Sequence, residues 1–234
     1  TPTDSDNNNT YIVNVRATDS AGNSSEQTIT TDILYNWIPV GNDIDGEAAG
    51  DASGSSVSLS ADGSVIAIGA SSNDGNGLDS GHVRIYQNVN DTWTKIGDDI
   101  DGEAAEDQSG PFVSLSADGS VVAISAYYND GKATDSGHVR IYQNVNNTWT
   151  KIGDDLDGEA TRDYFGFTPS LSADGSIVAI GAPGHESVNR GHVRIFKNDN
   201  GTWTQIGSDI DGEGPWDNFG RSVSISSNGS IVAI

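Results

Sequence analysis

The sequence contains neither cysteine nor methionine among its 234 residues. The lack of cysteine excludes a disulfide-stabilised scaffold, a zinc site built from thiolates and a cysteine nucleophile. No apolar run approaches the ~18 residues that a membrane-spanning helix requires, so we expect no membrane insertion in this segment. No stretch shows the apolar period of about 3.6 residues that is typical of an amphipathic helix. The chain is therefore expected to be all-β.

Positive charge is also scarce, because 11 lysine and arginine residues stand against 34 acidic residues and give a net charge of −23. Such a surface repels the phosphates of nucleic acids and the headgroups of anionic lipids. We therefore exclude nucleic acid as a partner. Two interpretations of the excess acid remain open at this point, an adaptation for solubility in salt and a set of binding sites for a divalent cation.

One stretch of the sequence is repeated: SLSADGSVIAIGA at 58–70 returns at 114–126 and 170–182, and begins again at 224–234. The tryptophans follow the same period, since Trp37, Trp93, Trp149 and Trp203 are separated by 56, 56 and 54 residues. A fixed period of this length predicts repeated units that stack on one another. Because the chain starts without methionine and stops within a repeat, we expect it to be a segment of a longer protein.

Each repeated unit shows four strand signals followed by an acidic connector. In the first unit, SVSLS at 56–60 alternates polar and apolar residues, and SVIAIGA at 64–70 is apolar on both faces, as in a covered strand. Between them, Asp62 and Gly63 are expected to form a two-residue turn with positive φ at both positions. The remaining signals are HVRIYQNV at 82–89, a turn at Asn90-Asp91 and TWTKIG at 92–97. These units predict a β-propeller of four-stranded antiparallel blades, here an incomplete ring of three full blades plus part of a fourth.

Two of the copies carry a family signature. DYFGFTPSLSADGSIVAIGAP at 163–183 and DNFGRSVSISSNGSIVAI at 217–234 resemble the FG-GAP repeats of integrin-alpha-type propellers. Phe165-Gly166 stands at the FG element and Gly181-Ala182-Pro183 at the GAP element. The resemblance covers about residues 35–234. It implies a propeller fold and a role in cell adhesion.

The resemblance does not extend to the calcium loop of the family. FG-GAP repeats typically hold calcium in a long acidic loop between their first two strands, whereas the loop here is the short SADGS. One aspartate in such a turn cannot supply the six to eight oxygens that calcium prefers. We therefore expect Asp62, Asp118 and Asp174 to be turn residues.

The first 34 residues do not fit the repeat. They contain two alternating patterns, YIVNVRAT and EQTITTDIL, and are similar to the C-terminal strands of a cadherin-like β-sandwich domain. In that resemblance Asp19 occupies the position of a calcium ligand, and a turn residue is the alternative. The expected domain boundaries are 1–34 for the cadherin-like strands, 35–41 for a lone outer strand around Trp37, and 42–97, 98–153, 154–207 and 208–234 for the propeller units. The lone strand is expected to complete a blade formed by strands from the far C-terminus.

The acidic connectors place carboxylates on either side of an apolar residue, followed by Gly-Glu. Strand alternation predicts a solvated connector with the apolar residue turned inward. Alternatively, the acids fold back around a hard cation, and calcium is the one cofactor that the sequence suggests. The candidate ligands are Asp43, Asp45, Glu47, Asp99, Asp101, Glu103, Asp155, Asp157 and Glu159.

The histidines of the GHVRI motif do not predict a zinc site. His82, His138 and His192 occupy equivalent positions in successive units, so they should lie about one blade apart and cannot share one metal ion. We expect them to fill a strand face beside the arginines of the same motif.

Aromatic residues distinguish the later copies from the first. They replace small residues near the connectors and the variable loops, and we expect them on one rim of the propeller, where they could stack on sugars or contact a protein loop. Packing beneath the loops is the alternative. The candidates are Tyr127, Tyr128, Tyr164, Phe165 and Trp216.

No catalytic residues are indicated, because the acid pairs recur in every unit whereas catalytic sites are singular. We expect a non-enzymatic, exported adhesion or recognition scaffold at the cell surface, with a protein or a carbohydrate as its partner. The alternatives are an accessory propeller domain of a secreted carbohydrate-active or other hydrolytic enzyme, and a purely structural spacer.

Overall fold

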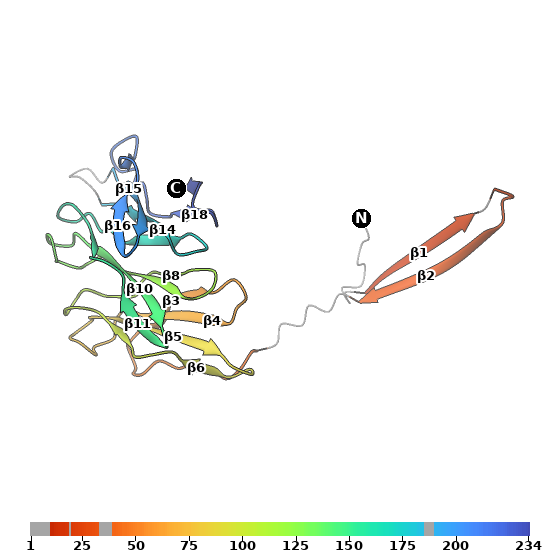
Figure 1. Ribbon diagram of the computed structural model, residues 1–234, viewed down its shortest axis with the longest axis horizontal. Coiled ribbons are helices and arrows are strands. Elements are labelled where there is room, and N and C mark those ends of the chain that lie inside the picture. The colour runs from red at the N-terminus through yellow and green to blue at the C-terminus, as the bar shows by residue number, and fades with distance from the viewer. Residues whose placement is uncertain (1–9, 19, 33–38, 185–189) are drawn as a thin grey trace. The chain divides into compact units, whose positions relative to one another are not determined.

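A computed structural model describes residues 10–18, 20–32, 39–184 and 190–234 of the chain (Figure 1). The chain divides into two compact units, Thr1–Val40 and Gly41–Ile234. In the first unit, β1 (Thr10–Thr18) and β2 (Ser24–Asp32) form one antiparallel hairpin. Asp19 and Trp37, for which a calcium ligand and a lone outer strand are predicted, lie outside the described residues.

Three sheets of the second unit share one topology. Four antiparallel strands follow one another in chain order, and a short fifth strand pairs with the third. We call these sheets blades 1, 2 and 3. Blade 1 comprises β3 (Ser53–Leu59), β4 (Val65–Ala70), β5 (His82–Asn88), β6 (Trp93–Lys95) and β7 (Ile100–Asp101). Blade 2 comprises β8 (Val113–Leu115), β9 (Val121–Ala126), β10 (His138–Val145), β11 (Thr148–Lys151) and β12 (Leu156–Asp157). Blade 3 comprises β13 (Phe167–Leu171), β14 (Ile177–Ala182), β15 (His192–Asp199), β16 (Thr202–Gln205) and β17 (Ile210–Asp211).

A two-stranded sheet of β18 (Ser224–Ile225) and β19 (Val232–Ala233) follows, and we call it blade 4. The first strands of successive blades contact one another, β3 with β8, β8 with β13 and β13 with β18. This arrangement confirms the predicted all-β propeller with four-stranded blades. Among the described residues, no helix is long and apolar enough to cross a membrane.

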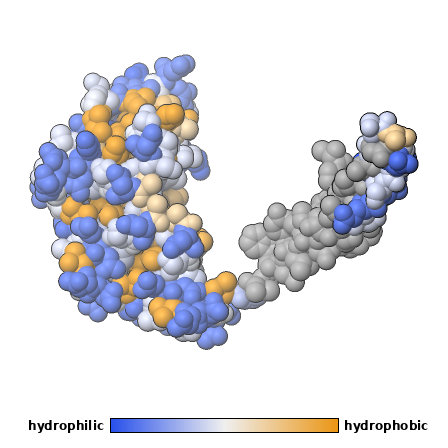
Figure 2. Space-filling view, turned by 45° about the vertical axis from the view of Figure 1, so that its right-hand side comes forward, coloured by the Kyte–Doolittle hydropathy of each residue, from blue (hydrophilic) through white to orange (hydrophobic). Residues whose placement is uncertain are grey.

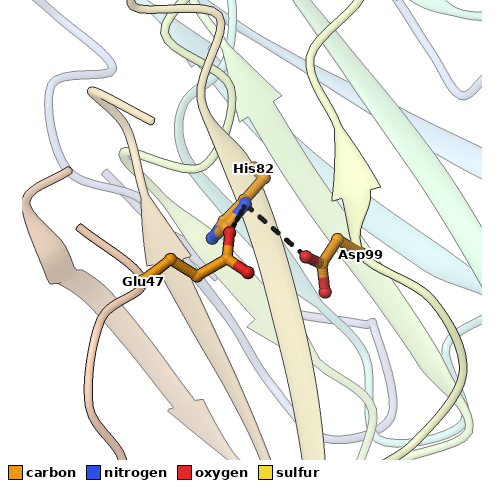
Figure 3. A group of neighbouring side chains, drawn as sticks. All are labelled: Glu47, His82 and Asp99. Atoms are coloured by element: carbon orange, nitrogen blue, oxygen red, sulfur yellow. Dashed lines mark ion pairs between the residues drawn. The ribbon is translucent and has the colours of Figure 1, made fainter. Parts of the chain in front are cut away.

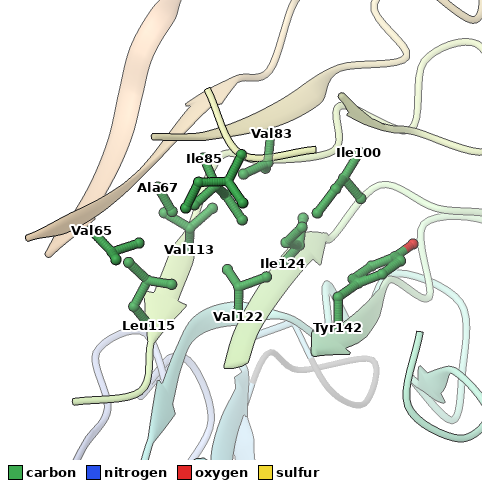
Figure 4. Packing of buried hydrophobic residues seen from close by; sticks show 11 residues of the cluster. Val65, Ala67, Val83, Ile85, Ile100, Val113, Leu115, Val122, Ile124 and Tyr142 are labelled. Carbon is green, nitrogen blue, oxygen red and sulfur yellow. The ribbon is translucent and has the colours of Figure 1, made fainter. Parts of the chain in front are cut away.

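The core lies between the blades, where the apolar faces of neighbouring sheets cover one another. The second strand of each of blades 1 to 3 is the most buried, as its apolar sequence predicts. Figure 4 shows how the facing sides of blades 1 and 2 interlock. The contacting residues are Val65, Ala67, Val83 and Ile85 of blade 1 and Val113, Leu115, Val122 and Ile124 of blade 2.

Hydroxyl groups link the first strands of neighbouring blades. The amide of Val113 donates to Ser56 Oγ at 2.9 Å, and the amide of Leu115 donates to Ser58 Oγ at 2.9 Å. Blades 2 and 3 repeat the second bond between Leu171 and Ser114 at 3.1 Å. The polar positions of the SVSLS pattern therefore satisfy backbone donors of the next blade. The sequence pattern alone predicts only that they alternate with apolar residues.

The hairpin between β3 and β4 differs from the expected two-residue turn. Only Gly63 has a positive φ, at 72°, and the amide of Ser60 donates to the carbonyl of Val65, so residues 61–64 form the loop. Asp62 accepts from the hydroxyl of Ser60 and the amide of Ser64 through one carboxylate oxygen. This local bonding makes a longer loop favourable. By contrast, the predicted turn at Asn90-Asp91 is confirmed, with φ values of 51° and 60°.

The equivalent aspartate of blade 3 offers a test of this turn. Asp174 Oδ1 accepts from Ser172 Oγ at 2.6 Å and from the amide of Ser176 at 3.0 Å, and these hydrogen bonds lower the pKa of the carboxyl group. In blade 4 the same bonds are made by the amide oxygen of Asn228. We expect Asp174→Ala to lower the free energy of unfolding by about 1 kcal/mol at pH 7, because the donors lose their acceptor. Asp174→Asn should cost much less, since Asn228 already serves in this turn.

The dependence of stability on pH provides a second check of this turn. A lowered pKa in the folded state contributes stability above the unfolded value of 3.8, and this contribution is lost as the pH falls through the folded value. The stability difference between the wild type and Asp174→Asn should therefore shrink below about pH 4 in urea unfolding at a series of pH values. A difference that stays constant from pH 7 to pH 3 would contradict this explanation.

Candidate functional site

Several of the connector acids lie in charge clusters around the GHVRI motif. In blade 1, the carboxylate of Glu47 contacts the guanidinium of Arg84, and Asp99 Oδ1 lies 3.2 Å from Arg84 Nε and 2.6 Å from Lys95 Nζ. His82 Nδ1 lies 3.8 Å from Glu47 Oε2 and 4.0 Å from Asp99 Oδ2 (Figure 3). The acids thus face a buried histidine with one oxygen and a cation with the other.

Blade 2 repeats this cluster with its own residues. His138 Nδ1 lies 4.0 Å from Glu103 Oε2 and 3.9 Å from Asp155 Oδ2. Arg140 pairs with Glu103 at 3.4 Å, and Lys151 pairs with Asp155 at 2.7 Å. Burial and the nearby guanidinium of Arg140 lower the pKa of His138 to about 4, so the imidazole is neutral at pH 7.

By donor type, each cluster could hold a transition metal, since an imidazole nitrogen and two carboxylate oxygens lie within 4.8 Å of one another. Each carboxylate is, however, already paired with arginine or lysine. A divalent cation would meet a cluster whose formal charges cancel, so electrostatics does not favour its binding. We interpret both clusters as structural.

The acids of one connector do not converge, because they are divided between two blades. Asp99 pairs with Arg84 of the preceding blade, whereas Glu103 pairs with Arg140 of the following blade. Arg140 also donates to the backbone carbonyl of Asp101 at 2.7 Å. The other predicted ligands, Asp43, Asp45, Asp101, Asp157 and Glu159, join no cluster of three ligand atoms within the described residues.

The aromatic residues predicted on the rim differ in burial and position. Phe165 is fully buried, and the Arg194 guanidinium lies 4.2 Å from the centroid of its ring, so its assignment to the exposed rim is corrected. Trp216 is 67% exposed and lies outside the cavity formed by the others. Tyr127, Tyr128 and Tyr164 gather between blades 2 and 3.

These three tyrosines form a continuous aromatic cluster. The ring centroids of Tyr127 and Tyr128 are 4.4 Å apart, and Tyr164 meets Tyr128 edge-on at 5.8 Å. The ring centroid of Phe167 lies 4.8 Å from that of Tyr127, and the ring centroid of Phe112 lies 5.1 Å from that of Phe167. Aromatic pairs in these geometries stabilise one another and hold the rings in place.

The cluster lines a cavity of about 300 Å³, which we call the tyrosine pocket. Its lining residues are Tyr127, Tyr128, Tyr164, Phe167, Pro183, Gly184, Asn218 and Arg221. Elsewhere, the face of the protein shown in Figure 2 carries hydrophobic side chains only in small patches among hydrophilic ones. The phenols are held protonated: burial and the neighbouring Tyr128 raise the pKa of Tyr127 to about 12, and burial and Asp135 raise the pKa of Tyr164. Their hydroxyl groups can therefore donate hydrogen bonds at neutral pH.

The blade interface beside the pocket departs from the repeat. The spacing places Phe112 at the position of Ser56, and Pro169 at the position of Val113. Between blades 1 and 2 those positions form the hydrogen bond from the Val113 amide to Ser56 Oγ. Between blades 2 and 3 the acceptor has become phenylalanine and the donor has become proline, which has no N–H group. Both partners are lost together, so no backbone donor is left unsatisfied and an aromatic ring takes the place of the hydroxyl.

The backbone of blade 3 is strained beside this replacement. Thr168 has a φ of 43°, a region that β-branched residues rarely adopt. Among the described residues, its counterparts Ser56, Phe112 and Ser222 have no positive φ. Strain of this kind is concentrated at functional sites. The comparison of copies that singled out the tyrosines could also have identified Phe167. Arg221 and Asn218 could not be found in this way, because they reach the pocket only through the stacking of blade 4 on blade 3.

Comparison with known proteins supports the architecture. No protein-family model matches the sequence, and no curated protein is similar enough to be a relative. A solved structure from Bacteroides uniformis, described as a "putative 6-phosphogluconolactonase", matches 97% of this chain with a TM-score of 0.53 and 15% identity. Hydrazine synthase of Kuenenia stuttgartiensis matches 75% of the chain at 14% identity and a TM-score of 0.46. A TolB-type protein of Agrobacterium tumefaciens matches 74% at 16% identity and a TM-score of 0.42.

The chain spans only part of these structures, 60% of the Bacteroides uniformis protein, 53% of the hydrazine synthase and 50% of the TolB-type protein. At these identities the likeness shows the fold, a β-propeller. It also corrects the prediction of an adhesion or recognition scaffold. One structure that resembles the chain over nearly its whole length is described as a putative 6-phosphogluconolactonase and not as an adhesion protein.

Proposed function

We propose that the tyrosine pocket binds a saccharide and that the propeller is the sugar-binding domain of an exported carbohydrate-processing enzyme. The observation that carries this proposal is the gathering of Tyr127, Tyr128, Tyr164 and Phe167 around one cavity. Aromatic faces provide the apolar surface on which the C–H groups of a sugar ring stack, and the phenol hydroxyls supply hydrogen bonds at its edge.

The size and location of the pocket support this proposal. A volume of about 300 Å³ is at the lower end of the range for small-molecule sites, and it suits one or two sugar rings. The pocket occurs at one place in the described part of the chain, as a specific ligand site does, whereas the charge clusters recur from blade to blade. The paired replacement of Phe112 and Pro169 lies between blades 2 and 3, and the strained Thr168 contacts blade 4.

The propeller supplies no catalytic group in this proposal, and the chemistry belongs to another part of the enzyme. The similarity of the fold to a protein named for 6-phosphogluconolactone supports an enzymatic context. The FG-GAP-like words of blades 3 and 4 and the cadherin-like pattern of the first hairpin support an exported multidomain protein.

Saccharide binding can be tested with the whole chain on a glycan array, followed by calorimetry with the glycans that bind. We expect Tyr128→Ala and Tyr164→Ala each to weaken binding about 10-fold, because each removes one stacking face, worth about 1.4 kcal/mol. Trp216→Ala is the matched control, since it removes an exposed aromatic ring outside the pocket. Failure of every glycan to bind, or an equal loss of affinity in the Trp216 variant, would contradict the proposal.

A further inference from the structure

We propose that the tyrosine pocket selects sugars that carry an anionic group, and that Arg221 binds this group. The inference rests on the proposed saccharide site and specifies its ligand. It is carried by the charge of the pocket, which is opposite to the charge of the protein.

Among the described residues, the lining of the pocket contains no acidic side chain, although 34 of the 234 residues are acidic. Arg221 is the one charged residue in this described lining. A neighbouring cavity is acidic, as is most of the surface of this protein. Its lining includes Asp79, Glu106, Asp107, Asp130 and Asp135. The tyrosine pocket therefore differs in both composition and sign.

Arg221 is also free to bind a ligand. Arg84, Arg140 and Arg194 are each paired with a glutamate of a connector. Arg221 is exposed and has no acidic side chain within 4.0 Å among the described residues. In a protein with a charge of −23, an arginine without a carboxylate partner at the mouth of an aromatic cavity can accept an anion without first breaking an ion pair.

The backbone holds Arg221 in place. Its amide donates to the carbonyl of Asn218 at 3.2 Å, and its carbonyl accepts from the hydroxyl of the strained Thr168 at 3.4 Å. Thr168 in turn accepts from the amide of Val223 at 3.0 Å. The backbone of Arg221 is therefore fixed at the interface between blades 3 and 4.

The cation is specific to this copy of the repeat. The spacing places Arg221 at the position of Ser55 in blade 1, Pro111 in blade 2 and Phe167 in blade 3. No blade geometry requires arginine there, because the other blades fold with uncharged residues. The remaining polar groups of the pocket are the phenol hydroxyls and Asn218, which can donate hydrogen bonds beside the guanidinium.

A planar guanidinium recognises a carboxylate or a phosphate through two parallel hydrogen bonds. The anionic group is thus the carboxylate of a sugar acid or a phosphate or sulfate ester. The two sources share the same chemistry at Arg221. They are distinguished by the ligands of the test.

The test is calorimetry of the whole chain with trigalacturonate, its methyl ester, maltotriose and glucose 6-phosphate. We expect an anionic sugar to bind at least 10-fold more tightly than the neutral ones, and this preference to weaken in high salt. Preferential binding of trigalacturonate assigns a carboxylate, and preferential binding of glucose 6-phosphate assigns a phosphate. Arg221→Gln should abolish the preference and leave the affinity for neutral sugars unchanged.

Lys197→Gln is the matched control, because this exposed cation of blade 3 lies outside the pocket. Equal binding of anionic and neutral sugars by the wild type would overturn the role of Arg221 while leaving the saccharide site intact. An equal loss of affinity for all sugars in Arg221→Gln would also overturn it. Failure of all four sugars to bind would count against the saccharide site itself.

Discussion

Alanine in place of Gly102 should lower the free energy of unfolding by more than about 3 kcal/mol, or prevent folding. Gly102 lies in the Asp-Gly-Glu segment of the connector after blade 1, and a Cβ atom there would overlap the backbone carbonyl oxygen of Ser80. The φ of Gly102 is not positive, so alanine is excluded by lack of space and not by the backbone conformation. The amide of Gly102 donates to the carbonyl of Gly81 at 2.8 Å, which fixes this close approach.

The matched control is Gly214→Ala in the connector after blade 3. A Cβ atom on Gly214 would have the Asp217 carboxylate as its nearest neighbour, at 3.7 Å, which is an ordinary contact. We expect this variant to unfold within about 0.5 kcal/mol of the wild type in urea. If Gly102→Ala and Gly214→Ala unfold at similar urea concentrations, the backbone contact does not explain the conserved spacing of glycine in the connectors of this chain.

The glycine explains why the connectors repeat. Gly158 meets the carbonyl of Ser136 as Gly102 meets that of Ser80. The glycine lets the connector pass against the blade that precedes it, and the glutamate after it pairs with the arginine of the next blade. The Gly-Glu segment of these connectors therefore joins two blades.

Much of the fold follows from the sequence because it depends on short-range patterns. The period of 56 residues, the four strand signals and the apolar second strand predict stacked four-stranded blades. Ile100 and Leu156 are buried, as the alternation of the connectors predicts, whereas Ile210 in the connector to blade 4 is exposed. The turn at Asp62 was predicted wrongly, because Asp-Gly favours a tight turn in general whereas the flanking serines favour a longer loop here.

Contacts between blades could not be predicted from one unit alone. The bond from Val113 to Ser56 joins residues 57 positions apart, and its existence depends on how the strands stack. The same limit applies to the acids. Their spacing within a connector is compatible with a metal site, but their partners are the cations of two different blades.

The tyrosine pocket was predictable in part. Comparison of the copies singled out Tyr127, Tyr128 and Tyr164, because they replace small or polar residues at equivalent positions. The same comparison could not separate Tyr164 from Phe165, which are neighbours in the sequence. Tyr164 has a φ of 52° and lines the pocket, whereas Phe165 enters the core.

Phe165→Ala should lower the free energy of unfolding by about 3–5 kcal/mol, because it removes a fully buried ring and leaves a cavity. The ring meets Phe196 edge-on at 6.2 Å and lies beneath the Arg194 guanidinium. Phe165→Leu retains most of the packing and should cost about 1–2 kcal/mol, which includes the lost cation–π interaction. Urea unfolding measures both changes, and a cost below about 1 kcal/mol for the alanine variant would show that the site is not tightly packed.

Comparison with Tyr164→Ala separates the structural residue from the ligand-binding one. Tyr164 is partly exposed and does not belong to the hydrophobic core. Its replacement by alanine should therefore lower the free energy of unfolding by less than about 1 kcal/mol while weakening saccharide binding. Phe165→Leu should show the reverse, with reduced stability and nearly unchanged affinity. Two adjacent aromatic residues would then serve opposite purposes at one interface, since Phe165 holds blade 3 against the connector and Tyr164 presents a ring to the cavity. If both variants lose stability and affinity in the same proportion, the aromatic cluster is a single packing unit and the pocket is not an independent binding site.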